Sequence, residues 1–180
     1  RYKVVLNQNI AAGTTGTVET NVADGAVYVE FDSLKIYSAK ANEETFVPTI
    51  SRKGYTFNGW KTAEGVLVIN ASGVLVNTAE DAAVKYVVTD KWKVANDNTA
   101  LFADWTAEQV TYTVKHVYEG VDDVAAIVEE DEFTATADSE VTPSTIAKDG
   151  FNSPAAKTVK VSANGDTTIE YNYTRKTFTL

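Results

Sequence analysis

The stretch that most clearly indicates the fold is Val110-Thr111-Tyr112-Thr113-Val114-Lys115-His116-Val117-Tyr118. Its side chains alternate with period two, which is the periodicity of a β-strand. Such a strand carries Tyr112, Val114, His116 and Tyr118 on one face. The chain as a whole has 24 Val and 24 Thr but only 6 Leu. Because β-branched residues fit a pleated surface and lose rotamer freedom in a helix, we expect a mainly β (α+β) protein.

Similar aromatic-led openings occur at residues 1–6 and 175–180, on either side of this stretch. Three such starts in one chain predict a tandem arrangement of small units. The segment 105–110 then reads as a short linker between the first two. We therefore predict one domain over residues 1–108, a second over 109–176, and the start of a further repeat or linker at 177–180.

Several shorter segments of the first domain also alternate or carry turn residues. Thr78–Tyr86 is the one helix candidate, because Thr78 can cap it and acidic residues follow in the first turn. In Tyr55–Trp60, alternation predicts Tyr55, Phe57 and Gly59 on one face and Trp60 on the other. The strands expected here are 27–31, 35–37, 55–60 and 101–105, with a hairpin over 65–76 around the turn 70–73.

The second domain shows the same strand-rich pattern. An Asn-Gly pair within 163–166 indicates a tight turn between the last two strands. Residues 124–128 fit either a strand or a short helix. The further strands expected are 132–137, 158–161 and 168–174. The prediction is thus two strand-dominated domains with at most one short helix each.

Charge and composition exclude several classes of protein. The formal net charge is −9, and such a surface repels the phosphates of nucleic acids and anionic lipids. The chain has no Cys, so it can form neither a disulfide framework nor a thiolate metal site. Residue 1 is Arg and no Met occurs, so we expect a piece of a longer or processed protein.

Two stretches resemble a known family. Residues 48–60 contain a Pro followed by the run Arg52-Lys53-Gly54-Tyr55-Thr56-Phe57-Asn58-Gly59-Trp60, and Leu101-Phe102-Ala103-Asp104-Trp105 follows later. The pattern resembles the Listeria–Bacteroides repeat, also called the internalin B-repeat, over about residues 1–106. The segment between the two Trp motifs is longer here than in that family.

The second domain resembles the mucin-binding-protein-like repeats. The similar segments are 112–116, 150–154 and 169–175. Both resemblances imply β-grasp (ubiquitin-like) folds in tandem on a bacterial cell surface. They imply an extracellular, Gram-positive protein that is anchored to the cell wall through a segment outside this sequence.

Residues able to carry chemistry are few. His116 is the only His, no catalytic motif surrounds any Ser, and its alternation with core positions favours a packing role. The acidic run Glu129–Glu132 lacks the spacing of a calcium loop and is typical of a solvated strand edge. Among the acidic residues nothing selects a glycosidase-type pair. We predict no catalytic, metal-binding or cofactor-binding residue and no cofactor, and the ligand-binding residues stay unknown.

Two further possibilities concern surface modules. An isopeptide crosslink could use Lys3, Lys115 or Asn172, although no motif requires the bond and its partners would have to be desolvated. Exposed aromatic rings could form a sugar-stacking platform. Burial in a small domain favours a structural role for the aromatic residues of the motifs, and we expect Trp92 to be the exposed one. The aromatic residues in question are Tyr55, Phe57, Trp60, Trp92 and Trp105.

The function we expect is a nonenzymatic repeat segment of a bacterial surface protein, acting as stalk, spacer or adhesin. The recognisable motifs consist of Gly, Pro and aromatic positions, which specify turns and core and perform no proton transfer. The partner would be a host or cell-wall glycan or a protein ligand, with no nucleic acid and no membrane insertion. The unit would be monomeric within a larger tandem array. The alternative is a carbohydrate-binding accessory module of a secreted enzyme.

Overall fold

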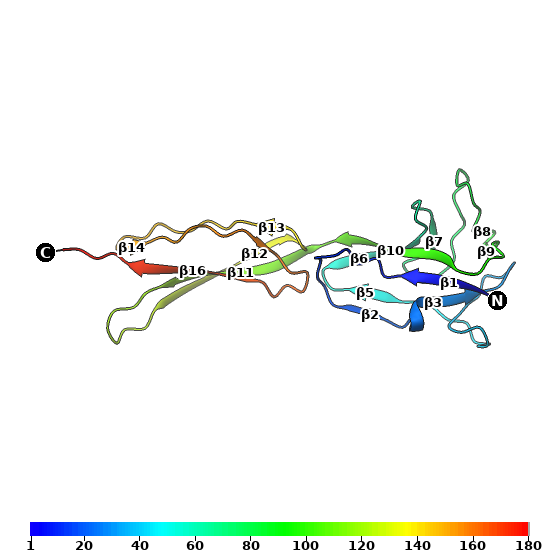
Figure 1. Cartoon of the computed structure of the whole chain (residues 1–180), viewed down its shortest axis with the longest axis horizontal. Helices are drawn as coiled ribbons and strands as arrows, with labels where there is room; N and C mark the ends of the chain where they lie inside the picture. The colour runs from blue at the N-terminus through cyan, green and yellow to red at the C-terminus, as the bar shows by residue number, and fades with distance from the viewer. Residues whose placement is uncertain (180) are drawn as a thin grey trace. The chain divides into compact units, whose positions relative to one another are not determined.

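A computed structural model describes residues 1–179 of the chain (Figure 1). It is mainly β, with 43% of residues in strands and 2% in helix, which confirms the predicted class. The described residues contain one helix, the 3₁₀ turn η1 (Ala23–Gly25). The chain divides into two compact units. Unit 1 comprises Arg1–Gly13 and Thr17–Thr106, and unit 2 comprises Thr14–Gly16 and the chain from Ala107 onward.

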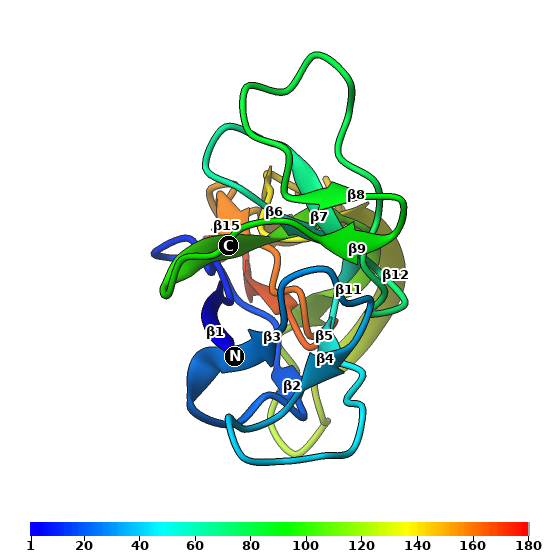
Figure 2. The same ribbon diagram turned by 90° about the vertical axis from the view of Figure 1, so that its right-hand side faces the viewer.

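Unit 1 is built on one large sheet. Its hydrogen-bonded order is β2-β5-β6-β10-β1-β3-β4, and β7 pairs with β6. The hairpin of β8 and β9 is separate from this sheet (Figure 2). The strands are β1 (Tyr2–Asn7), β2 (Val18–Thr20), β3 (Ala26–Val29), β4 (Ile36–Tyr37), β5 (Ile50–Arg52), β6 (Tyr55–Lys61), β7 (Leu67–Asn70), β8 (Val87–Val88), β9 (Lys91–Trp92) and β10 (Thr99–Ala107).

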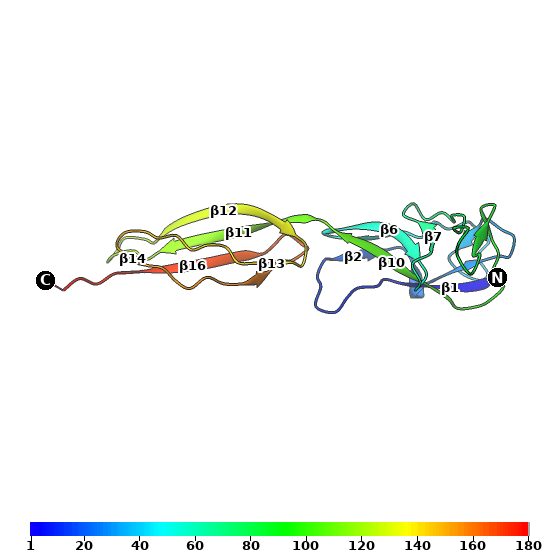
Figure 3. The ribbon, with the colours of Figure 1, turned by 90° about the horizontal axis from the view of Figure 1, so that it is seen from above.

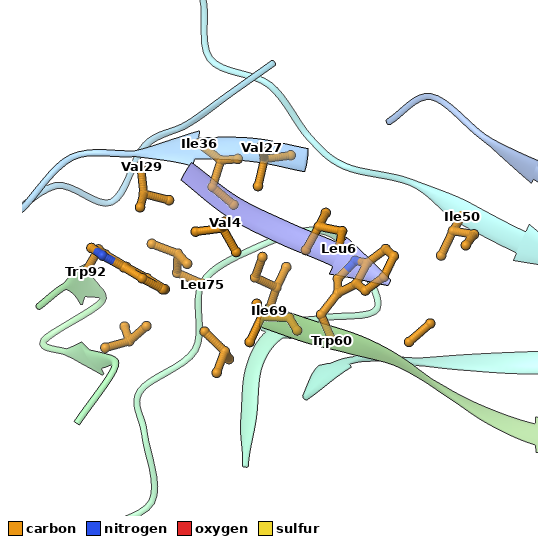
Figure 4. Close-up of a cluster of buried hydrophobic side chains, with 14 residues drawn as sticks. Val4, Leu6, Val27, Val29, Ile36, Ile50, Trp60, Ile69, Leu75 and Trp92 are labelled. Carbon is orange, nitrogen blue, oxygen red and sulfur yellow. The ribbon is translucent and has the colours of Figure 1, made fainter. Parts of the chain in front are cut away.

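At the centre of this sheet, β1 lies between β3 and β10. It pairs antiparallel with β3, so that Val4 faces Val27, and parallel with β10, so that Leu6 faces Leu101. The first strand of the unit therefore lies beside the last. Alternating side chains of these strands form the core, in which Val4, Val27 and Leu101 have no exposed surface. Figure 4 shows Val4 in one cluster with residues of β7 and β9.

Unit 2 is built on a smaller sheet with the order β12-β11-β16-β14. β11 pairs antiparallel with β12 over its whole length, from Gln109↔Thr136 to Tyr118↔Ile127. On its other side it pairs parallel with β16 (Figure 3). The strands are β11 (Gln109–Tyr118), β12 (Ile127–Thr136), β13 (Glu140–Val141), β14 (Phe151–Asn152), β15 (Val159–Lys160) and β16 (Thr168–Arg175).

A long excursion, residues 140–160, packs on this sheet. β13 and β15 pair antiparallel at its base, and β14 pairs with the end of β16. Two core hydroxyls hold the irregular parts between these strands. Tyr171 Oη donates to the carbonyl of Pro143 (2.6 Å) and accepts from the amide of Lys157 (3.1 Å). Tyr173 Oη accepts from the amide of Ile146 (2.9 Å).

The two units share one arrangement of strands. In each, the first strand is central, an antiparallel strand flanks it on one side, and the last strand of the unit flanks it in parallel on the other. The predicted strands at 1–6, 55–60, 101–105, 110–118 and 168–174 are all present, with ends shifted by one or two residues. The hairpin around residues 70–73 is confirmed, since Ile69 bridges Leu75 and the amide of Gly73 donates to the carbonyl of Asn70 (2.9 Å).

The helix predicted over Thr78–Tyr86 is wrong. The amide of Thr78 donates to the carbonyl of Val87 (2.9 Å), and the amide of Val87 donates back to Thr78 Oγ1 (2.9 Å). The Thr78 hydroxyl, which would cap a helix, instead accepts a hydrogen bond from Val87 at the other end of the loop. Lys85 Nζ also donates to the carbonyl of Ala79 (2.6 Å), which is an acceptor that a helix would use.

The alternation predicted for Tyr55–Trp60 is wrong at its last residue. The rings of Phe57 and Trp60 lie 5.3 Å apart, in one core rather than on opposite faces. The cause is local: Gly59 has φ of 123°, and the pairing of β6 with β7 shifts register between Trp60 and Lys61. An irregularity of this kind re-aims the side chains that follow it.

Three predictions near the C-terminus have different outcomes. β16 ends at Arg175, and residues 176–179 have no regular structure. The start of a further repeat or linker expected at 177–180 stays a prediction, and Leu180 lies outside the described residues. The tight turn at 163–166 is present, with Gly165 at φ of 72°. However, β15 and β16 do not pair with each other, so this turn closes no hairpin. Of the undecided segment 124–128, only Ile127 and Val128 belong to a strand, β12.

Candidate functional site

His116 lies on the inner face of β11, as the alternation predicted, and it is 4% exposed. Its ring stacks on Tyr171 at 5.7 Å, and its Nδ1 lies 2.7 Å from Tyr173 Oη. That hydroxyl already accepts from the amide of Ile146, so its own proton is available for Nδ1. This network favours the tautomer with the proton on Nε2. His116 therefore has a structural role in the core, and Nε2 is the nitrogen left without a partner among residues 1–179.

The acidic run Glu129–Glu132 lies on β12, which is one of the two edge strands of the sheet. Its side chains alternate between the two faces. Glu129 pairs with Lys148 (2.9 Å), and Glu130 pairs with Lys115 (2.8 Å). The hydrogen bond from Lys148 lowers the pKa of Glu129, and the hydrogen bond to Glu130 raises the pKa of Lys115. In the described part of the chain, the side chains of Asp131 and Glu132 form no ion pair or hydrogen bond.

A groove of about 280 Å³ lies along the inner face of this edge strand. The rings of Tyr112 and Phe133 stack there with their centroids 5.7 Å apart. Phe133 is 46% exposed, so its ring is accessible. The lining comprises Tyr112, Val114 and His116 from β11, Asp131 and Phe133 from β12, and Pro143, Ser144 and Ile146 from the excursion. The groove thus combines one accessible aromatic ring, that of Phe133, with the buried ring of Tyr112 and one unpaired carboxylate, that of Asp131.

Sequence reasoning singled out His116 but missed the groove around it. Tyr112 and Phe133 are opposite each other only because β11 and β12 pair in the observed register. The alternation of each strand was a usable signal, since it places Asp131 and Phe133 on one face of the strand. The opposite side of the groove is formed by the excursion, and no pattern in the sequence predicts where that segment packs.

The aromatic residues of the first domain form part of the core of unit 1. Trp60 is 1% exposed, and Phe57 contacts both Trp60 and Trp105 (5.3 and 5.4 Å between centroids). Tyr55 meets the edge of Trp105, and Arg52 stacks on the ring of Tyr55 at 3.7 Å. These contacts support the structural role predicted for the motif residues.

Trp92 is the exception, because the prediction that it is exposed is wrong. It has no exposed surface and belongs to the same core (Figure 4). Its Nε1 donates to the carbonyl of Val94 (2.5 Å), and its backbone pairs with the loop after β3 through Asp32 and Ser33. The charged neighbours in sequence, Lys91 and Lys93, bind Asp32 at the surface while the ring points inward.

The candidate isopeptide residues lie on strands but not in a desolvated site. Lys115 and Asn172 are on the outer face of the sheet of unit 2, where Lys115 is paired with Glu130. Lys3 is half-buried on β1 and pairs in register with Tyr28. Nothing in these surroundings supplies the desolvation that the bond would need.

The remaining features of the described residues do not form a second candidate site. A hollow of about 310 Å³ in unit 1 lies beside the surface ion pair of Lys61 and Asp104 (2.7 Å). No group of three or more His, Asp or Glu side chains within residues 1–179 is arranged to hold a metal ion. No helix among these residues has the length and apolar character needed to cross a membrane. Compared with protein-family models, with curated proteins and with solved structures, the chain matches none of them.

Proposed function

We propose that this chain is a nonenzymatic repeat segment of a bacterial surface protein, whose units act as a load-bearing stalk or spacer and carry an adhesive face. The observation that carries the proposal is the parallel pairing of the first and last strands within each unit. Together with the resemblance of the sequence motifs to surface repeats, this pairing supports a mechanical role for the fold.

The mechanical argument is clearest in unit 2. The chain enters through β11 and leaves through β16, and these neighbours pair in parallel from Thr113↔Thr168 to Tyr118↔Tyr173. A force that pulls the two chain ends apart acts at opposite ends of this pair. It therefore loads the hydrogen bonds of the pair in shear, so that they resist together instead of opening one after another.

Unit 1 has the same construction. β1 and β10 pair in parallel from Val4↔Thr99 to Asn7↔Phe102. Only Glu108 separates β10 from β11 in the sequence, so a pull passes from the last strand of one unit to the first strand of the next without a long linker. A tandem array of such units would transmit tension from a cell wall to whatever lies distally.

The same strand order supports a β-grasp-like classification of both units. A central parallel pair made of the first and last strands, with an antiparallel partner beside the first, is what the predicted fold requires. In unit 2 the excursion 140–160 occupies the connection in which a helix would be expected, and Tyr171 and Tyr173 hold it. We propose that these units are β-grasp variants in which an irregular segment replaces the helix.

The setting we propose follows from the motifs and the charge. The segment would lie outside the cell, anchored to the wall through a part of the protein outside this sequence, as a monomer in a tandem array. Its partner would be a host or cell-wall glycan or a protein. The alternative, a carbohydrate-binding accessory module, has less support, because Trp60 and Trp92, two rings considered for a sugar platform, are buried.

Force spectroscopy with two attachment geometries tests the mechanical proposal. The chain has no Cys, so handles can be placed at Q109C and R175C to load unit 2 along β11 and β16. In the matched control, Q109C and T136C load the β11–β12 hairpin at its end pair, which opens bonds one after another. We expect the first geometry to resist several times more force. Equal forces would contradict a load-bearing role.

A cell-level comparison separates spacing from adhesion. Bacteria that carry the parent protein without residues 1–180 are compared with cells in which an unrelated spacer of equal length replaces them. Restored adhesion with the unrelated spacer indicates a stalk, and adhesion only with the native segment indicates an adhesin. Turnover of a glycan or peptide by the purified chain would contradict the nonenzymatic role.

A further inference from the structure

The inner face of β12 already binds one cationic side chain, which comes from the protein itself. Lys148 of the excursion places its Nζ 2.9 Å from Glu129 Oε1. The same Nζ lies 3.8 Å from the centre of the Tyr118 ring on β11. An acidic residue of β12 and an aromatic residue of β11 thus hold an ammonium group between them by ion pairing and a cation–π contact.

Two residues further along β12, an acidic side chain again lies beside aromatic rings, but no cationic side chain from the described residues is bound there. Asp131 follows Glu129 on the same face of β12, and the stacked rings of Tyr112 and Phe133 lie next to it. All three line the groove described above. Within residues 1–179, the carboxylate of Asp131 has no ion-pair or hydrogen-bond partner. The buried ring of His116 also lines the groove, and its Nε2 has no partner among residues 1–179.

The backbone beside this groove is open as well. β12 is an edge strand of ten residues, and nine of them are exposed. An edge strand presents unpaired amide and carbonyl groups in a row, to which an extended segment of another chain can add. A strand that adds here has every second side chain on the face of the groove.

We propose that unit 2 binds an extended, basic peptide segment that adds to the free edge of β12 and places a lysine or arginine side chain in the groove, against Asp131 and the Tyr112–Phe133 rings. Charge selects this occupant. Glu132, on the other face, is a second carboxylate of β12 without a partner in the described structure, so a strand with basic residues finds an anion on both faces. A second copy of this chain would bring the same acidic strand and a net charge of −9.

Peptide binding at β12 rests on the proposed adhesive role of the segment. Its test is independent of the proposed load-bearing role. The probe is a synthetic peptide that alternates Val and Lys and has the length of β12. Binding to the whole chain is followed at low salt through the amide NMR signals of residues 127–136. We expect shifts concentrated on β12 and on Tyr112. A peptide with Glu in place of Lys should not bind.

Two variants separate the groove from general charge. Asp131→Asn and Glu132→Gln each remove one negative charge from the same strand, but only Asp131 lies in the groove. We expect Asp131→Asn to weaken binding by about tenfold and Glu132→Gln by about twofold or less. Both variants are first shown to keep the amide spectrum of the folded chain.

A peptide that alternates Pro and Lys tests the edge addition, because Pro cannot donate backbone hydrogen bonds to a strand. It should bind at least about tenfold more weakly than the Val–Lys peptide. Three results would overturn the proposal: no binding of the Val–Lys peptide, equal loss in the two variants, or equal binding of the Pro–Lys peptide. None of these would bear on force resistance, so failure here is distinguishable from failure of the stalk proposal.

Discussion

The backbone of Gly59 has φ of 123°, a conformation that residues other than glycine rarely adopt. A Cβ atom added there would lie 2.6 Å from the carbonyl oxygen of Ile69 and 2.7 Å from Leu67 Cδ1. The glycine therefore allows β6 and β7 to approach each other and turns Trp60 into the core. The Gly-Trp pair of the sequence motif has a physical reason at this one position.

We predict that Gly59→Ala lowers the free energy of unfolding by about 3 kcal/mol, through backbone strain and overlap with β7. Urea unfolding of the whole chain measures the change. Gly65→Ala is the matched control, since Gly65 has φ of 85° but nothing within 4 Å of an added Cβ. It should cost about 1 kcal/mol. Equal losses for the two variants would show that close packing at Gly59 is not the cause.

A second residue-scale prediction concerns acid stability. Glu30 accepts hydrogen bonds from Arg1 Nε (2.8 Å) and from Tyr37 Oη (3.1 Å). The hydrogen bond from Arg1 is the main cause that lowers the pKa of Glu30. A carboxyl group with a lowered folded-state pKa stabilises the fold above its unfolded pKa, and this stabilisation is lost as the pH falls through the folded value.

We therefore predict that acidification below about pH 4 lowers the melting temperature of the wild type more than that of Glu30→Gln. At neutral pH the variant should melt below the wild type. Thermal unfolding followed by circular dichroism from neutral to acidic pH measures both curves. Glu19→Gln, which changes an exposed carboxylate, is the control and should follow the wild type. Parallel curves for wild type and Glu30→Gln would rule out the explanation.

At the scale of elements, the excursion 140–160 shows how an irregular segment can be held on a sheet. It has few backbone pairs of its own, and its fixed points are side-chain hydroxyls from β16. Tyr173 Oη serves both the amide of Ile146 and the ring of His116. Because these groups are buried or half-buried, removal of the hydroxyl leaves two polar groups without a partner.

We predict that Tyr173→Phe lowers the free energy of unfolding by about 2 kcal/mol. The amide of Ile146 should exchange its hydrogen faster than the loss of global stability alone explains. The exchange of the amides in the middle of β11 should accelerate only as much as the lower free energy of unfolding requires. Hydrogen exchange measured by NMR tests both statements. Tyr28→Phe serves as control, since the Tyr28 hydroxyl has no hydrogen bond within the described residues. Unchanged exchange at Ile146 would show that Tyr173 does not hold the excursion.

At the scale of the whole molecule, the chain contains two hydrophobic cores, one in each unit. Separate cores predict separate folding, since a domain with its own core can fold alone. We expect a fragment of residues 1–106 and a fragment of residues 107–180 each to unfold cooperatively. The second fragment lacks Thr15, which belongs to unit 2 and donates to Asp138 (2.7 Å), so it should melt below the same unit in the whole chain.

Calorimetry of the two fragments and of the whole chain measures these transitions. If neither fragment shows a cooperative transition, independent folding is wrong. Adding residues 14–16 to the second fragment through a short linker is the control, and it should recover part of the difference. The predicted boundary near residue 108 concerns folding, and this experiment tests it directly.

Local sequence determined several of the strands and turns of this protein. Alternation in Val110–Tyr118 was sufficient to place β11 and to put His116 on its inner face, because the period of a strand is set by its own backbone. Asn and Gly at residues 70–73 were sufficient for the hairpin turn, because few residues adopt positive φ at low cost. The excess of Val and Thr over Leu was sufficient for the mainly β class.

Tertiary structure alone decided which strands became neighbours and what their faces enclose. The parallel pairs β1–β10 and β11–β16 join residues that are 95 and 55 positions apart in the sequence, for which no local signal exists. Trp92 is buried although its neighbours are charged, because the β8–β9 hairpin turns its ring into a core made by distant strands. The groove at Asp131 depends on the register of β11 and β12 and on the position of the excursion. Both are set by packing between distant segments of the chain, so no single segment encodes them.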